Sequence, residues 1–178
     1  MKSGFRLALL CCLLVLGSGL RADDDTYRFQ AQICTGLGDQ KELTSSRIGY
    51  SFGMHGLYLL QPGEFIRPRV DVTVYPEITW ATVQTSGSNL SFGADFIQYF
   101  GGGSPWFGVA GVAEMIWSGS TANRPIPAGP ADTTRLGINL GMGYKINEGV
   151  TYEIRYTRSS LSKAFPTASI GLGVTVKF

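Results

Sequence analysis

The ordinary pKa of histidine suits it to act as a general base near neutral pH, and this chain contains one histidine, His55. Ser51 precedes it by four residues, and a serine activated by a histidine could attack an acyl ester. Both residues fall on one face of a segment that we predict to be a strand. Two pleats separate them by roughly 13 Å along that strand, which is beyond hydrogen-bond reach. We therefore expect His55 to be structural, with a serine from a neighbouring strand as the alternative partner.

The other reactive residue types do not gather into sites. Cys34 has no base near it in the sequence, so we expect it to pack as a small buried side chain. One histidine and one cysteine without further ligands do not make a metal site. The run Gly101-Gly102-Gly103 is not followed by the Lys-Ser/Thr pair and helix of a phosphate-binding loop. The sequence therefore predicts no catalytic residue, no cofactor and no bound metal.

The chain begins with the three parts of a secretory signal peptide. They are a basic start at Lys2 and Arg6, an apolar run from Leu7 to Leu16, and small residues at Gly17–Gly19 and Ala22. The apolar run is too short to span a bilayer. We predict cleavage after Ala22, with Gly19 as the alternative, so residues 1–22 are the signal peptide and residues 23–178 form one exported domain.

The composition of that domain excludes several classes of protein. Of the 15 basic residues three lie in the signal peptide, which leaves 12 against 13 acidic residues and a net charge of −1. Such a chain lacks the positive surface that binding to nucleic acid requires. It contains no run of 18 or more apolar residues, so a membrane could be crossed only by strands. Over the whole chain, the 24 glycines and 12% aromatic residues favour a β protein.

Apolar and polar side chains alternate along three stretches near the end of the chain, Arg135–Ile146, Val150–Thr157 and Ala168–Phe178. In the first stretch, six apolar residues from Leu136 to Ile146 lie on one face, opposite glycines and polar residues. This alternation lasts for about the 9–11 residues that a strand needs to cross an outer membrane at a tilt. Helical spacing fits none of the three stretches.

The remaining strands follow from weaker patterns. We predict them at Tyr27–Gly36, Ile48–Leu60, Phe65–Tyr75, Leu90–Phe100 and Trp106–Trp117, which makes eight in all. The short connections are Gln61–Glu64, Gly101–Pro105 and Asn147–Gly149, and the long ones are Leu37–Arg47, Pro76–Asn89, Ser118–Asp132 and Ser159–Thr167. Alternation of short turns and long loops with an even strand number is typical of transmembrane barrels. We therefore predict an all-β fold, an eight-stranded antiparallel up-and-down barrel with both termini at the end of the short turns.

Aromatic residues near the predicted strand ends suit the two membrane interfaces. They are Tyr27, Trp80, Tyr99, Phe100, Trp106, Phe107 and Trp117. The chain also ends on an amphipathic strand whose last residue is Phe178. In these features residues 26–178 resemble the small OmpX-, OmpA-barrel- and opacity-like outer-membrane proteins. The resemblance implies a location in the outer membrane, contact with its lipid and lipopolysaccharide, and recognition of the Phe178 strand by the outer-membrane assembly machinery. We expect a monomer.

An eight-stranded barrel leaves an interior that side chains nearly fill. The charged residues that we place inside are Arg28, Arg67, Arg69, Arg135, Lys145, Arg155 and Lys177, with Asp71, Asp95, Glu114 and Glu153. We expect them to form ion pairs that fill the lumen, because buried charges must be paired. A narrow polar pathway for small solutes is the alternative. Inward-facing glycines such as Gly137 and Gly143 would leave space for the long arginines.

The last third of the chain also resembles the PagL family of lipid A deacylases. That family has a His-x-Ser-Asn motif on a strand, followed by a Glu that orients the His. Here Ser160 matches the nucleophile, but Arg158 replaces the His, Leu161 replaces the Asn, and Ala168 or Ser169 replaces the Glu. A protonated arginine cannot accept the serine proton. We therefore predict that the chain is not an enzyme, with lipid A deacylation as the alternative.

Function on a rigid barrel is usually displayed by its loops. Ser118–Asp132 contains Pro125, Pro127 and Pro130, and Pro76–Asn89 would present Trp80 among serines and threonines. We expect these loops to be solvated, with an extracellular partner as the alternative. A soluble lipocalin-like barrel would instead turn its apolar residues inward. We predict a non-catalytic outer-membrane barrel that serves envelope structure or surface interaction through its long loops.

Overall fold

The structure, a computed structural model, describes residues 27–38, 40–41, 48–80, 83–121, 133–162 and 165–178. These residues form nine strands: β1 (Tyr27–Leu37), β2 (Ile48–Gly56), β3 (Tyr58–Gln61), β4 (Glu64–Trp80), β5 (Val83–Tyr99), β6 (Trp106–Thr121), β7 (Thr133–Lys145), β8 (Val150–Ser162) and β9 (Phe165–Lys177). The predicted signal peptide, residues 1–22, lies outside the described residues. So do residues 42–47 and 122–132 of the expected long connections.

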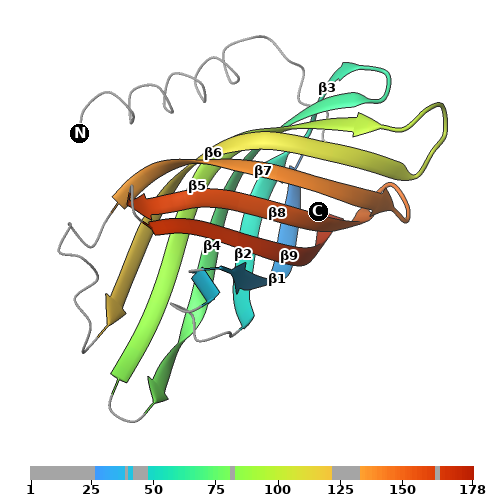
Figure 1. Ribbon diagram of the computed structural model, residues 1–178. Coiled ribbons are helices and arrows are strands. Elements are labelled where there is room, and N and C mark those ends of the chain that lie inside the picture. The colour runs from blue at the N-terminus through green and yellow to red at the C-terminus, as the bar shows by residue number, and fades with distance from the viewer. Residues whose placement is uncertain (1–26, 39, 42–47, 81–82, 122–132, 163–164) are drawn as a thin grey trace.

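The strands close into one antiparallel barrel (Figure 1). Apart from β2 and β3, which do not pair with each other, each strand pairs with its neighbours in sequence, and β1 also pairs with β9, from Arg28 opposite Lys177 to Leu37 opposite Ala168. Because β2 and β3 both pair with β4, they are two parts of one barrel strand interrupted at Leu57. The predicted eight-stranded antiparallel barrel is therefore confirmed. Within the described ranges, no helix is long and apolar enough to cross a membrane.

Alternating burial follows from the alternating sequence. In β7, Gly137 and Asn139 are buried, whereas Ile138, Leu140 and Met142 are 45 to 52% exposed. The same arrangement recurs around the barrel, so large apolar side chains cover the outside, whereas the buried polar and charged side chains lie inside. This is the inverse of a soluble barrel, and it excludes the lipocalin-like alternative.

The short connections match their predicted positions. Gly63 and Gly103 adopt φ angles of 87° and 84°, a conformation that side chains disfavour. The backbone N–H of Lys177 donates to the carbonyl of Gly149, which places the end of the chain beside the turn between β7 and β8. We call this end of the barrel the short-turn end. The first and last described residues both lie there, as predicted.

Two of the expected long connections are largely strand. Pro76–Asn89 was predicted to be a loop, but β4 and β5 continue through it until Trp80 pairs with Val83. Pro76 is tolerated because it lies in a register shift of β4, beyond the point where pairing with β2 ends. Ser159–Thr167 is likewise paired between β8 and β9. The Ser, Thr and Gly content of these two segments is typical of loops. Both segments nevertheless extend their hairpins beyond the apolar part of the barrel.

The aromatic girdle is only partly as predicted. Tyr27, Phe100 and Trp106 are about half exposed on the outer surface near the short-turn end. Phe107 and Trp117, however, are buried in the lumen with 2 and 8% exposure, because inner positions of β6 carry odd numbers. Tyr99 also packs inward against Phe107, with ring centroids 5.2 Å apart. The side chain of Trp80 lies outside the described part of the chain.

Candidate functional site

A cluster of ion pairs crosses the middle of the lumen. Arg67 on β4 donates from Nη2 to Asp95 Oδ2 on β5 at 2.7 Å and from Nη1 to Glu153 Oε2 on β8 at 2.6 Å. The three side chains are at most 3% exposed. Arg67 thereby spans the lumen to Glu153 on the opposite side, since β4 and β8 are separated in the sheet by β5, β6 and β7.

Three further residues complete this ion-pair cluster. Arg69 donates to Asp71 on the same strand and, from Nε, to Asp95 Oδ1 at 3.2 Å. Arg155 donates from Nε to Glu153 Oε1 at 2.7 Å. The cluster therefore holds three guanidinium groups and three carboxylates, so its formal charge is zero. These six residues confirm the predicted ion pairing of the lumen.

The other five charged residues that we placed in the lumen lie outside the ion-pair cluster. Glu114 is on the outer face, because its neighbours Ala113 and Met115 are the buried residues of that part of β6. Arg135 is exposed. Lys145 donates to Glu148 Oε1 at 2.6 Å at the short-turn end, and this hydrogen bond lowers the pKa of Glu148.

Arg28 and Lys177 are half-buried near the same turn. Arg28 donates from Nη1 to the backbone carbonyl of Glu148 at 3.2 Å. Neither residue belongs to the ion-pair cluster.

His55 is attached to the edge of the ion-pair cluster. Its Nε2 lies 2.8 Å from Asp71 Oδ1, and its side chain is fully buried. Its Nδ1 has no hydrogen-bond partner among the described residues. Ser51 instead accepts a hydrogen bond from Thr73 Oγ1 at 2.9 Å. No described serine therefore pairs with His55, and the arrangement is that of a structural histidine.

Apolar side chains fill the lumen between the ion-pair cluster and the short-turn end. Ile97, Phe107 and Val109 form this layer, with Leu57 and Phe65 packed against it. A Cβ added at Gly143 would collide with the Phe107 ring. This glycine therefore leaves room for Phe107, whereas we had expected it to leave room for an arginine. Gly137 likewise leaves room for Met115.

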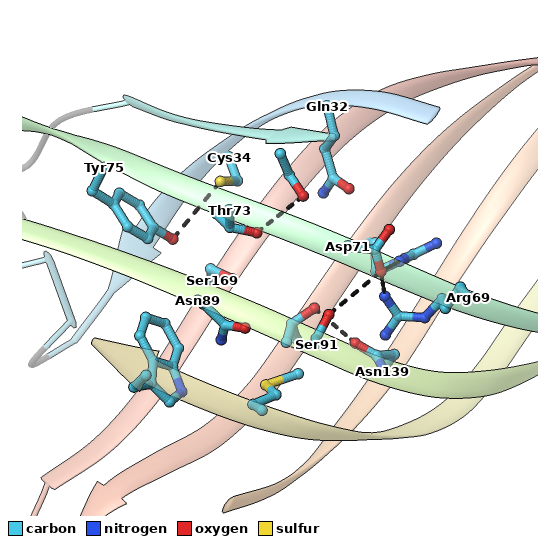
Figure 2. A pocket seen from close by; sticks show the side chains of 15 residues that line it. Gln32, Cys34, Arg69, Asp71, Thr73, Tyr75, Asn89, Ser91, Asn139 and Ser169 are labelled. Atoms are coloured by element: carbon cyan, nitrogen blue, oxygen red, sulfur yellow. Dashed lines mark hydrogen bonds and ion pairs between the residues drawn. The ribbon is translucent and has the colours of Figure 1, made fainter. Parts of the chain in front are cut away.

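On the other side of the ion-pair cluster the lumen contains a polar cavity of about 40 Å³ (Figure 2). All eight barrel strands contribute to its wall. Cys34 lies in the wall with its Sγ 3.7 Å from Tyr75 Oη. Gln40, from the connection after β1, donates to the same Tyr75 hydroxyl at 2.6 Å and is 2% exposed. Nothing in the sequence around Gln40 predicted that this connection turns into the barrel.

The residues that resemble the deacylase motif do not come together as a catalytic site. Arg158 is exposed on the outer face of β8, opposite Ala168 on β9. Ser169 instead lines the cavity in the lumen. Ser160 pairs with Pro166 near the end of the hairpin, and its side chain, like that of Leu161, lies outside the described residues. Arg158 lacks the basic nitrogen of the family's His, and Ala168 and Ser169 lack the carboxylate of its Glu.

No protein-family profile matches the chain, and no curated protein matches it in sequence. Solved structures do match it in fold. Neisserial surface protein A is 18% identical with a TM-score of 0.55, and the match covers 88% of this chain and 98% of that one. Ail, the attachment invasion locus protein of Yersinia pestis, is 11% identical with a TM-score of 0.53, covering 86% and 97%.

The outer membrane enzyme PagL is 13% identical with a TM-score of 0.57, and the match covers 85% of this chain and 99% of that one. At these identities the similarity establishes the fold and no activity. The three proteins include an enzyme and two whose names indicate a surface protein and an attachment protein. The chain has the fold of the small eight-stranded outer-membrane barrels.

Proposed function

We propose that this chain is a non-catalytic integral outer-membrane protein, a rigid barrel that serves envelope structure or surface interaction through its long external hairpins and loops. The observation that carries this proposal is the filled lumen. The ion-pair cluster and the layer around Phe107 lie one after the other along the barrel axis. A solute could pass only if buried ion pairs and packed apolar side chains both separated, which would be costly.

The outer surface supports the membrane location. Leu140, Ile154 and Phe52 lie on different strands, and each is more than half exposed. Water would oppose such a continuous apolar surface, whereas lipid solvates it. The hairpins of β4–β5 and β8–β9 extend the barrel at the end away from the short turns and would be displayed outside the cell.

The competing function is hydrolysis of an acyl ester of lipid A. The protein refolded into vesicles that contain lipid A should leave its acyl chains intact, measured by mass spectrometry after prolonged incubation. The Ser160→Ala variant is the matched control and should give the same spectrum. Loss of an acyl chain with the unchanged protein but not with Ser160→Ala would refute the non-catalytic proposal.

A further inference from the structure

The outer face of the barrel carries two charged side chains in one part of its wall. Glu114 on β6 and Arg158 on β8 both face outward, and β7 lies between these two strands (Figure 1). Within the described part of the chain, neither residue has a hydrogen-bond or ion-pair partner. Charges on a lipid-facing surface are costly and are normally paired. These two charges therefore indicate a contact that a single barrel does not make.

Both charges lie within the apolar belt of the barrel. Ile116 continues the outer face of β6 two residues farther from the short-turn end than Glu114. On β7, Leu136 lies farther from that end than Ile138, the residue opposite Arg158, and it is 73% exposed. Since apolar side chains cover the surface beyond both charges, an isolated barrel would hold Glu114 and Arg158 against lipid.

The pairing registers place the two charges at nearly the same height along the barrel axis. Followed from strand to strand, they lead from Tyr27 on β1 through Val112 and Arg158 to Leu37 on the same strand. This stagger of 10 residues (37 − 27) over eight strands raises each strand by 1.25 residues (10/8) relative to the one before. Arg158 is two strands after Val112 and so 2.5 residues higher (2 × 1.25), and Glu114 is two residues above Val112 on β6. The two heights thus differ by half a residue.

A second copy of the same barrel would pair both charges. A two-fold axis that runs parallel to the barrel axis beside β7 brings β6 of one barrel next to β8 of the other. Every residue keeps its height under this rotation, so Glu114 of each copy meets Arg158 of the other. One acidic and one basic residue per chain then give two ion pairs. Between the pairs, Leu136 and Ile138 on the outer face of β7 would pack against the same residues of the second copy.

An anionic lipid headgroup fits this face less well. Its phosphate would be attracted by Arg158 but repelled by Glu114 at the same height, whereas a second copy pairs both residues. We propose that the outer face of β6, β7 and β8 is a homodimer interface in which Glu114 pairs with Arg158 of the second copy. This proposal replaces the monomer that we expected from the sequence. Each barrel is closed by itself, so dilution in lipid should separate the dimer into folded monomers.

Charge reversal tests the pairing. The full-length protein, refolded in detergent micelles, should show a monomer–dimer equilibrium in sedimentation experiments. Glu114→Arg and Arg158→Glu should each weaken the dimer about tenfold or more, because like charges then face each other. The double variant exchanges the two charges and should restore the dimer to within about threefold of the unchanged protein. A double variant as weak as the single ones would overturn the proposal. An unchanged protein that is monomeric at every concentration would also overturn it and would leave this face to lipid.

A cysteine cross-link locates the interface without altering either charge. In a background whose three cysteines are alanine, Ile138→Cys places a thiol beside the proposed two-fold axis. The control Phe52→Cys replaces a residue of similar exposure, 51% against 45%, but it lies on β2, four strands from β7 in either direction. Mild oxidation in outer-membrane vesicles should join Ile138→Cys into a covalent dimer and leave Phe52→Cys monomeric. Equal cross-linking of the two variants, or none, would overturn the proposal, and this result decides if a charge-reversal variant does not fold.

Discussion

Replacing Arg67 by methionine tests whether the ion-pair cluster holds the barrel together. The substitution keeps an unbranched side chain of similar length but removes the donors to Asp95 and Glu153. Arg69 still contacts Asp95 at 3.2 Å and Arg155 still contacts Glu153 at 2.6 Å, so neither carboxylate is left fully unpaired. The cluster nevertheless acquires a net charge of −1 in the lumen.

Breaking one partner of a buried pair costs about 3–5 kcal/mol, and the remaining contacts favour the lower end, about 3 kcal/mol. The matched control is Lys145→Met, because Lys145 pairs with Glu148 where the two side chains are 30 and 88% exposed. An exposed pair of this kind contributes about 0–1 kcal/mol. The difference between the two variants should therefore be at least about 2 kcal/mol.

The assay is reversible urea unfolding of the barrel in lipid vesicles, followed by tryptophan fluorescence and by the mobility of unheated protein on gels. Equal unfolding free energies for Arg67→Met and Lys145→Met would refute the conclusion that the buried cluster stabilises the closed barrel. A stabilised Arg67→Met barrel would refute it as well, since the desolvation cost of the arginine would then exceed its pairing.

Two further predictions use the same unfolding assay and concern the inner and outer faces. Gly143→Ala should destabilise the barrel by about 1–3 kcal/mol, because the new Cβ would meet the Phe107 ring. The control Gly102→Ala places its Cβ in open space and should change the unfolding free energy little. Equal effects of the two substitutions would contradict the packing described for the apolar layer. Leu140→Arg should cost about 2–4 kcal/mol and Leu136→Arg, nearer the end of the strand, about 1 kcal/mol or less; equal costs would contradict a lipid-facing belt around the middle of the barrel.

The barrel was predictable from the sequence because its strands alternate so regularly. In β7, β8 and β9 the apolar face is unambiguous, and a shift of one residue would reverse it. In β6 both faces are apolar, with Phe107 and Met115 inside and Val112 outside, so the pattern alone could not assign a face. That ambiguity explains why Glu114 was placed in the lumen. Only pairing with β5 and β7 decides the matter.

The sequence predicted which types of residue lie in the lumen, but not which of these residues contact one another. Alternation places Arg67, Asp95 and Glu153 inside, but their pairing depends on strands 28 and 86 residues apart in sequence. The buried position of Gln40, in a connection without any periodic pattern, was not predictable either. Its side chain donates a hydrogen bond to Tyr75, and a contact of this kind leaves no mark in a single sequence.

The pairing of β1 with β9 has a consequence for how the barrel folds. Arg28 lies opposite Lys177, so the closing contacts join residues 149 positions apart (177 − 28). Pairing at such a sequence separation is entropically expensive and slow to form. Until β9 arrives, β1 and β8 each present an unpaired edge, and the arginines of the lumen stay open to water. Closure of the ring and burial of its charges therefore belong to one late, cooperative event, and a chain shortened at its C-terminus should lose both together.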